Sequence, residues 1–348
     1  QQAFEMQNRN YKYGKGRMCK IPVSIVKSAA GTYPILGLQE RNEKKEREEK
    51  KMLLTIEGLQ VRYGKQTALK ITSPVAFEKG ERIGVIGSNG AGKSTLVKAL
   101  LGLLPYEGRI VTNLPPEQMA VHMQFNEYVT TMSVKCIMEA ILNTKIKADK
   151  ELQELIAFFD FESCLSQKYN ALSGGQKQKF TIIMVMMQKA ELTFYDEVTS
   201  GLDFETRQKL TEKMVSWYRD KKDTLLVVSH YYDELEQLAD KILVLDQGKV
   251  VAYGNKEELF KTYCGRVIFI MDNRQRNREL MQTFQTLRAP EHLLAIAGRN
   301  KKEEEKIVSI LIENDINFKR SNSDIEIMFM NAKENFYRQQ EDKIENEK

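Results

Sequence analysis

The sequence predicts an α/β fold in which a largely parallel core sheet carries a phosphate-binding loop, and three observations support this prediction. Short apolar runs alternate with helical stretches through the middle of the chain, which is the rhythm of βαβ units. The segment Gly87 to Thr95 reads GSNGAGKST and fits the GxxxxGK[ST] pattern. An apolar run, Arg82 to Ile86, precedes this loop and a helical run, Ser94 to Leu103, follows it, so strand, loop and helix come in the required order.

Length and composition set the broad class of the protein. A chain of 348 residues is long enough for two domains, or for one large domain with appendages. The longest apolar run, around 182–187, is far shorter than the roughly 20 residues that span a bilayer. The four cysteines form no CxxC pair, which favours reduced thiols over a disulfide framework, and we assign no metal site to them.

Net charge is uneven along the chain. Residues 1–52 hold 12 Lys and Arg and 6 Asp and Glu, which leaves 41 basic and 42 acidic residues in the rest. This near-neutral charge of residues 53–348 argues against a nucleic-acid-binding enzyme, because such an enzyme should carry a basic surface on its folded part. Residues 1–51 are expected to be a basic, charged and flexible extension. Two roles stay open for it, a solvated segment without function and a basic arm against an anionic membrane surface.

The elements of the main domain, expected over 52–262, follow in order. Paired strands are expected at 53–64, and a buried strand at 82–87 leads into the phosphate-binding loop. A further strand is expected at 119–125, and apolar spacing predicts a helical insertion over about 126–172. Strands return at Leu192–Tyr195, Leu225–Val228 and Ile242–Leu245, and a hairpin is expected around Asp246 to Gly248.

The rhythm restarts on a smaller scale after about Cys264. A small α+β accessory domain is expected over 263–330, with strands at 266–271, 293–298 and 324–330 and helices at 273–287 and near 303–312. A charged, helical tail is expected over 331–348.

The phosphate-binding loop supplies the first candidate site residues. Glycines let backbone N–H groups turn toward phosphate oxygens, the helix that follows adds positive potential, Lys93 adds a point charge, and the Ser94 hydroxyl can reach magnesium. The candidate nucleotide-binding residues are Gly87, Ser88, Asn89, Gly90, Ala91, Gly92, Lys93, Ser94 and Thr95. By itself the motif indicates only a nucleoside triphosphatase.

Further motifs follow the loop: LSGGQ at 172–176, LTFYDE ending in Asp196 and Glu197, SGLD at 200–203 and VVSH ending in His230. Together with the loop they resemble the ATP-binding cassette (ABC) family of transporter ATPases. Their order and spacing are those of the family, and the resemblance covers about residues 53–262. It implies an ABC-type phosphate-loop fold with a β subdomain, a core sheet and a helical insertion.

The resemblance implies a role for each matching residue. Asp196, Ser94 and Gln124 would hold magnesium, because carboxylate, hydroxyl and amide oxygens suit this ion. Glu197 would accept a proton from the attacking water, while His230 would reach the γ-phosphate and Gln124 would also assist catalysis. Tyr63 would stack on adenine. One residue departs from the family pattern: Val198 replaces the proline that usually follows the two acids, which puts the rigidity of this turn in doubt.

The LSGGQ segment has a different implied role. Ser173, Gly174, Gly175 and Gln176 would form a helix N-terminus that closes over the nucleotide of a partner chain, and Asp203 belongs to the same nucleotide-binding set. The site would therefore be completed only in a head-to-tail dimer. A homodimer and a heterodimer are both compatible with the sequence.

The function that the resemblance implies is an ATP-binding and ATP-hydrolysing subunit with ATP and Mg²⁺ as ligands. It would work at the cytoplasmic face of the cell membrane on a separate permease, and the C-terminal segment favours export of a peptide or drug-like compound. Three alternatives are an import ATPase, a soluble ABC ATPase acting on nucleic acid or ribosomes, and a regulatory module that does not hydrolyse ATP. The intact Glu197 and His230 argue against the last. The sequence does not identify the cargo.

Overall fold

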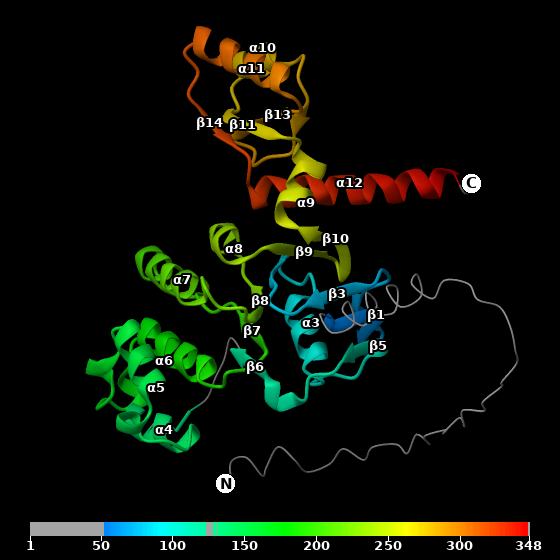
Figure 1. Ribbon diagram of the computed structural model, residues 1–348. Helices are drawn as coiled ribbons and strands as arrows, with labels where there is room; N and C mark the ends of the chain where they lie inside the picture. The colour runs from blue at the N-terminus through cyan, green and yellow to red at the C-terminus, as the bar shows by residue number, and fades with distance from the viewer. Residues whose placement is uncertain (1–51, 123–127, 130, 347–348) are drawn as a thin grey trace, which may run out of the picture. The chain divides into compact units, whose positions relative to one another are not determined.

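The computed structural model describes residues 52–122, 128, 129 and 131–346, and these described residues belong to one compact unit. A large mixed sheet of ten strands and a smaller sheet of four strands are present in this unit (Figure 1). The large sheet contains β1 (Met52–Tyr63), β2 (Gln66–Lys70), β3 (Val75–Glu78), β4 (Arg82–Ile86), β5 (Glu107–Thr112), β6 (Met119–His122), β7 (Leu192–Asp196), β8 (Thr224–Val228), β9 (Lys241–Asp246) and β10 (Lys249–Asn255).

The strand order of the large sheet is β3-β1-β2-β10-β9-β4-β8-β7-β6, with β5 paired to β1. Neighbours from β9 to β6 are parallel, whereas β1 pairs antiparallel with β2, β3 and β5. The predicted parallel core sheet with an added β subdomain is therefore confirmed. Strand β4 lies between β8 and β9, which places the loop that follows it at the carboxyl edge of the parallel strands, where such sheets bind ligands.

Helices cover both faces of the parallel strands, which explains why those strands are predominantly apolar. Successive residues of β7 to β9 alternate between two core clusters. One cluster contains α3 (Lys93–Leu100) together with the antiparallel strands. The other contains α6 (Gly174–Met186), α7 (Phe204–Tyr218) and α8 (Tyr232–Leu238).

The predicted helical insertion is present between β6 and β7. It contains α4 (Val134–Ile141), α5 (Lys150–Phe158) and the first part of α6, and the buried rings of Phe159, Phe161 and Phe180 form its centre. Short 3-10 turns lie at Pro116–Gln118, Ile146–Ala148, Glu162–Cys164 and Tyr169–Ala171.

The predicted hairpin joins β9 to β10, which are antiparallel with Asp246 opposite Lys249. The two residues between them, Gln247 and Gly248, both have positive φ, 47° and 74°, as a two-residue type I′ turn requires. This turn brings Asp246 next to the phosphate-binding loop.

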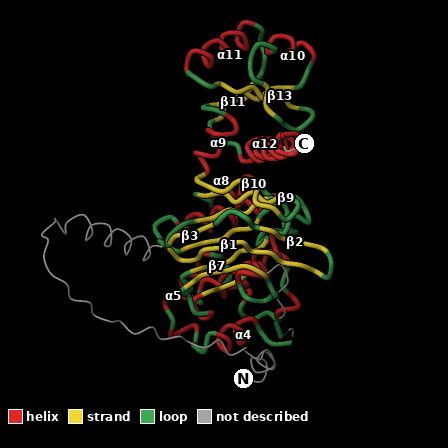
Figure 2. The backbone as a smooth tube through the Cα atoms, turned by 90° about the vertical axis from the view of Figure 1, so that its right-hand side faces the viewer, coloured by secondary structure: helices red, strands yellow, loops and turns green. Residues whose placement is uncertain are grey.

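The C-terminal part of the chain forms the smaller antiparallel sheet in the order β12-β13-β11-β14. Figures 1 and 2 show α10 and α11 on the far face of this sheet, and α9 and α12 between the two sheets. Its elements are α9 (Lys256–Cys264), β11 (Val267–Asp272), α10 (Gln275–Met281), β12 (Thr286–Leu287), β13 (Leu293–Gly298), α11 (Lys301–Glu313), β14 (Phe318–Ser321) and α12 (Ile325–Asn346).

The prediction of a strand at 324–330 is wrong, because helix α12 begins in this segment. The buried residues Ile325, Met328, Phe329 and Ala332 are spaced by three and four residues, so they form one face of a helix. The Asp324 carboxylate accepts a hydrogen bond of 3.0 Å from the backbone N–H of Ile327 and caps the first turn. Polar and apolar residues alternate in the segment DIEIMFM, which is the pattern typical of a strand, so the sequence predicts a strand there.

The helix expected at 273–287 is also shorter than predicted. Helix α10 ends at Met281, and Thr286 and Leu287 instead pair with β13. Leu287 is buried by this pairing, so the tertiary environment decides its conformation. The expected domain limits at 262 and 330 fall within α9 and α12.

Candidate functional site

The phosphate-binding loop begins where the buried strand β4 ends. A Cβ atom on Gly87 would lie only 2.3 Å from the Leu245 carbonyl oxygen, and Gly92 has a φ of 99°, so both positions require glycine. The Lys93 ammonium donates hydrogen bonds of 2.8 Å to the Gly87 carbonyl and 3.2 Å to the Ser88 carbonyl. Burial lowers the pKa of Lys93, and the charges of Glu197 and Asp196 oppose this shift. The ammonium is thus held inside the loop.

Two carboxylates follow strand β7, at the same sheet edge. Burial raises the pKa of Asp196, and a hydrogen bond from the Ser94 side chain opposes the shift. Glu197 has a positive φ of 52°, which is strained for a residue with a side chain. Its Oε1 lies 2.5 Å from Nε2 of His230. Strained backbone is common at functional sites, and the strained residue here is the one that contacts His230.

One cavity brings these groups together. It has a volume of about 370 Å³ and is lined by Ala68, residues 89–95 of the loop, Glu197 and His230. Hence the structure gathers the loop and two of the predicted catalytic side chains around one space. Ala68, in β2, is a lining residue that the motifs did not indicate.

The oxygen atoms of Asp196 and Ser94 beside this cavity are the candidate ligands for magnesium. Oδ1 of Asp196 is buried and has no hydrogen-bond partner among the described residues, although its residue lies beside Ser94. A carboxylate and a hydroxyl oxygen suit Mg²⁺, which usually takes its remaining ligands from water and substrate phosphates. Within the described ranges no group of three or more His, Cys, Asp and Glu side chains could hold a metal. The residues present therefore fit a magnesium ion that is bound together with a nucleotide.

Several predicted site residues lie outside this cavity. Tyr63 ends β1 with 51% of its surface exposed. Asp203 caps α7, where its carboxylate accepts a hydrogen bond of 3.0 Å from the Thr206 N–H. Gln124 lies outside the described residues. The roles proposed for these residues remain predictions.

The LSGGQ segment forms the N-terminus of α6 through a capping box. The Ser173 hydroxyl accepts a hydrogen bond from the Gln176 N–H at 3.3 Å, and the Gln176 side chain accepts one from the Ser173 N–H at 2.8 Å. Ser173 and Gly174 are exposed, and a Cβ atom on Gly174 would meet nothing within 4 Å. This helix end is open to solvent, and its residues do not line the cavity at the phosphate-binding loop.

The turn after Glu197 is held by hydrogen bonds, although Val198 replaces a proline. Val198 itself is buried. The carboxylate of Glu234, in α8, accepts hydrogen bonds from the Thr199 hydroxyl and, at 2.6 Å, from the Ser229 hydroxyl. Glu234 thus connects the turn after Glu197 to the residue before His230. The motifs did not indicate this residue.

Comparison with known proteins agrees with these observations. Residues 73–200 match the family model described as ABC transporter. Energy-coupling factor transporter ATP-binding protein EcfA1 of Geobacillus kaustophilus is 30% identical over 227 residues, which cover 60% of this chain and 81% of that protein. Linearmycin resistance ATP-binding protein LnrL of Bacillus subtilis is 29% identical over 233 residues, covering 62% and 73% of the two chains.

A relative named for import is similar to the same degree. Molybdate/tungstate import ATP-binding protein WtpC of Thermococcus kodakarensis is 29% identical over 222 residues, covering 60% of this chain and 67% of that protein. A solved structure described as the ATP-binding subunit of an ABC transporter superposes with a TM-score of 0.53 at 26% identity, covering 61% of this chain and 93% of that chain. Within residues 52–122, 128, 129 and 131–346, no helix is long and apolar enough to cross a membrane.

Proposed function

This chain belongs to the ABC transporter family of ATP-binding subunits, which are ATPases, and from this premise we propose that it hydrolyses magnesium-bound ATP to drive a separate membrane permease. The observation that carries the proposal is the single cavity shared by the phosphate-binding loop, Glu197 and His230. Positive groups for phosphates and an acceptor for a proton face the same space. That combination is what phosphoryl transfer to water needs.

The proposed reaction assigns one step to each side chain. Loop N–H groups and the Lys93 ammonium bind the β- and γ-phosphates. The Glu197 carboxylate takes a proton from water as the water oxygen bonds to the γ-phosphorus and the bond to the ADP oxygen breaks. His230 orients the γ-phosphate. Asp196, Ser94 and Gln124 would hold magnesium, which neutralises phosphate charge when it is bound.

We further assign the open end of α6 to the nucleotide of a second ABC subunit. The exposed N–H groups of this helix terminus suit an anion. Gly174 leaves room for a phosphate oxygen, because nothing lies within 4 Å of the position of its missing Cβ. ATP held between two chains would stabilise the dimer, and hydrolysis would release it.

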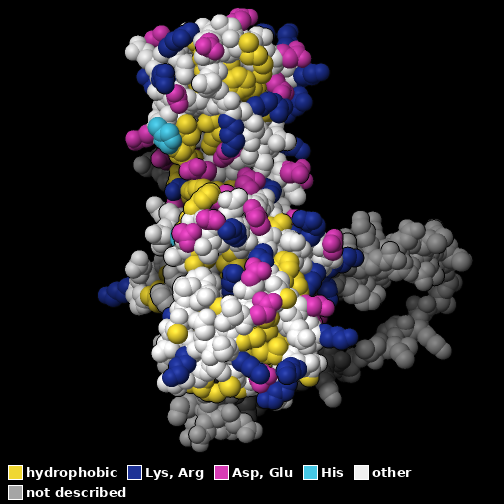
Figure 3. Space-filling view, turned by 90° about the vertical axis from the view of Figure 1, so that its left-hand side faces the viewer, with side chains coloured by type: hydrophobic (Ala, Val, Ile, Leu, Met, Phe, Trp, Pro, Cys, Tyr) yellow, Lys and Arg dark blue, Asp and Glu magenta, His cyan; other side chains and the backbone are white. Residues whose placement is uncertain are grey.

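The proposed direction of transport is export of a peptide or drug-like compound. Two relatives support it: one is named for linearmycin resistance and another for export of a Nod factor. An import ATPase is the alternative, since the import protein for molybdate or tungstate covers a similar share of this chain. Nucleic acid is a less suitable substrate: on the face in Figure 3, Lys and Arg side chains are interspersed with Asp and Glu over the described part, whereas nucleic-acid binding calls for a basic patch.

ATP turnover by the purified chain with magnesium tests the proposed chemistry. Glu197→Gln is expected to lower kcat by roughly a hundredfold or more, because the proton acceptor is lost, with little change in ATP affinity. Glu205→Gln is the matched control, since Glu205 is exposed in α7 and pairs with Lys209. Equal turnover of the Glu197 variant and wild type would show that Glu197 is not the proton acceptor.

The transport proposal needs a separate experiment. The chain is expected to co-purify with a permease encoded by a neighbouring gene, and the reconstituted complex should move its cargo away from the side on which ATP is hydrolysed. Movement toward that side would make the protein an importer. Stable association with ribosomes instead of a permease would overturn the transport function.

A further inference from the structure

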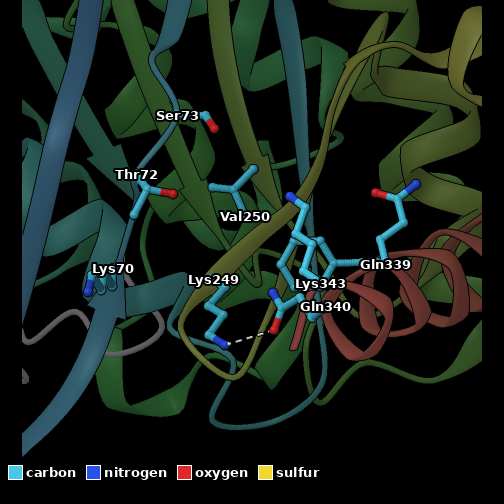
Figure 4. Close-up of a pocket in the computed structure, with 9 residues that line it drawn as sticks. Lys70, Thr72, Ser73, Lys249, Val250, Gln339, Gln340 and Lys343 are labelled. Carbon is cyan, nitrogen blue, oxygen red and sulfur yellow. Dashed lines mark hydrogen bonds between the residues drawn. The ribbon is translucent and has the colours of Figure 1, made fainter. Parts of the chain in front are cut away.

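A second cavity lies between α12 and the neighbouring strands β2 and β10, and its lining shares no residue with the cavity at the phosphate-binding loop. Its volume is about 350 Å³, and its lining includes Lys70, Lys249 and Lys343 together with the hydroxyl groups of Thr72 and Ser73. Figure 4 shows the Lys249 ammonium directed toward the side chain of Gln340. Three segments that are distant in sequence thus bring cationic and hydroxyl groups to one space.

Two of these lysines are direct neighbours in the sheet. Lys249 of β10 pairs in register with Lys70 of the parallel strand β2, so the two side chains leave the same face of the sheet and their like charges repel each other. Within the described ranges none of the three lysines makes an ion pair. Lys249 has only an amide oxygen as partner, at 3.4 Å in Gln340. Among the described residues, no carboxylate offsets this local repulsion through an ion pair with any of the three lysines.

We propose that this cavity is a binding site for a small anion that carries a phosphate group. Ammonium groups bind phosphate as point charges, and hydroxyl groups can donate to its remaining oxygens. The volume is sufficient for a small ligand. A bound anion would also offset the repulsion between Lys70 and Lys249. The phosphate can belong to a free metabolite or to the headgroup of an anionic lipid.

Lysine reactivity in the full chain tests this site. With the phosphate-binding loop filled by Mg–ADP, inorganic pyrophosphate is added, and the acylation rate of each lysine is measured by mass spectrometry. Acylation of Lys249 and Lys343 is expected to slow by about threefold when roughly two thirds of the sites are filled. Lys261, exposed in α9, is the internal control, and chloride at the same ionic strength is the control for screening.

Vesicles distinguish the two sources of the phosphate. Protection by vesicles of phosphatidylcholine and phosphatidylglycerol, but not by phosphatidylcholine alone, assigns the site to lipid headgroups. Protection by pyrophosphate alone assigns it to a free compound. Lys249→Met should abolish protection of Lys343 while keeping the melting temperature equal or higher, because a like-charge pair is removed. Absence of protection by either probe, or equal protection of Lys261, overturns the site.

An independent observation concerns the first half of α12. The Asp246 carboxylate is buried and accepts a hydrogen bond of 2.8 Å from the Ser88 hydroxyl in the phosphate-binding loop. Its other contacts come from α12: the Tyr337 hydroxyl donates to Oδ2 at 2.7 Å, and the Lys333 ammonium lies 2.9 Å from Oδ1. One carboxylate therefore connects the C-terminal helix to the nucleotide-binding loop.

We infer that Asp246 is a positioning residue for ATP binding and that α12 controls it, an inference that rests on the proposed ATPase function. Lys333 and Tyr337 fix the carboxylate, and the carboxylate fixes Ser88 in the loop. Movement of α12 would remove two of the three partners of Asp246. The Asp246 carboxylate would then also accept hydrogen bonds from solvent and would hold Ser88 less firmly. The loop would bind phosphates less tightly as a result.

Nucleotide affinity of the full-length protein tests this connection. Tyr337→Phe and Lys333→Met are each expected to raise the Kd for ATP by about fivefold, with kcat at saturating ATP changed less than roughly twofold. Lys333→Arg should restore affinity. Arg338→Met is the matched control in the same helix, because Arg338 is exposed and contacts only Glu334 among the described residues.

A double-mutant cycle separates positioning from general stability. If both residues act through Asp246, Ser88→Ala and Tyr337→Phe should weaken ATP binding less than additively. Additive effects, or a lower melting temperature with unchanged affinity, would overturn the inference. Affinity is measured without turnover, so a protein that binds ATP normally but fails to hydrolyse it would refute the proposed ATPase and not the role of α12.

Discussion

Asp246 shows how a buried charge can stabilise this protein. Burial raises the pKa of this carboxyl group, but hydrogen bonds from Lys333, Tyr337 and Ser88 outweigh burial and hold it below its ordinary value. Folding therefore favours the ionised form. The stabilisation is fully present above the unfolded pKa, about 3.9, and is lost as pH falls through the lower folded pKa.

Asp246→Asn is accordingly expected to lower the free energy of unfolding by about 2 kcal/mol at neutral pH, the order of a hydrogen bond to a charged group. The difference from wild type should shrink below about pH 4. Urea unfolding at a series of pH values measures both effects, with the exposed Asp220→Asn as control. A difference that stays constant from neutral pH into the acid range would contradict the ionic role.

Glu234 is a second residue that acts through its neighbours. Its carboxylate is the acceptor for both Thr199 and Ser229, so Glu234→Ala would leave two hydroxyl groups without their partner. We expect kcat to fall by roughly tenfold, on the order of 1.4 kcal/mol, with ATP affinity little changed, because Glu197 and His230 lose their relative alignment. Steady-state turnover and equilibrium binding measure the two quantities. A loss of affinity with kcat intact would exclude this role.

Sequence motifs predicted those site residues whose neighbours are close in the chain or are placed by the parallel sheet. Lys93 belongs to a contiguous loop, and Glu197 and His230 follow adjacent strands, so their meeting could be expected. Asp246 and Glu234 could not be found in this way. Their polar partners include Ser88, 158 residues from Asp246, and Thr199, 35 residues from Glu234, and no local pattern encodes such pairs.

At the scale of elements, α12 attaches the C-terminal part to the body of the protein. It packs on α8, α9 and β10, and Met328 on its inner face is almost completely buried. Met328→Ala is expected to reduce the free energy of unfolding by about 2–4 kcal/mol through loss of contacts and a residual cavity. Glu341→Ala, on the exposed part of the same helix, should change it by less than about 0.5 kcal/mol. Denaturant unfolding of both variants tests this packing, and similar losses would contradict it.

Element types were predictable where burial and periodicity agree. Strands β4, β7, β8 and β9 are predominantly apolar, as strands covered on both faces are, and they lie where expected. The first turns of α12 resemble a strand in sequence, because their polar residues alternate by chance with apolar ones over a few positions. A longer window that includes Ala332 and Phe336 shows the helical period.

At the scale of the whole molecule, the open end of α6 predicts association through ATP. Glu197→Gln with ATP and magnesium should sediment as a dimer, while the same variant without ATP should not. Gly174→Asp in that background should keep the fold, because its side chain enters open space, yet prevent dimerisation by repelling phosphate. Analytical ultracentrifugation measures this outcome. A nucleotide-dependent dimer that persists with Asp at this position would place the interface elsewhere.

The order of strands in the large sheet could not be predicted from the sequence. Alternating strands and helices predict parallel neighbours, but several orders satisfy that rhythm. The placement of β4 between β8 and β9 follows from tertiary packing of the two core clusters. The position of α12 against the turn at Asp246 has the same origin.

The central position of β4 has a consequence for biosynthesis. Among the described strands, the one that leads into the phosphate-binding loop pairs with β8 and β9 alone, and both leave the ribosome much later. The hydrogen-bond partner of Ser88 lies 158 residues further along the chain. Such distant pairing slows folding, and the unpaired edges of β4 are exposed to aggregation in the meantime. A nascent chain should acquire affinity for ATP only after β9 has emerged, so truncated translation products would be unable to capture nucleotide.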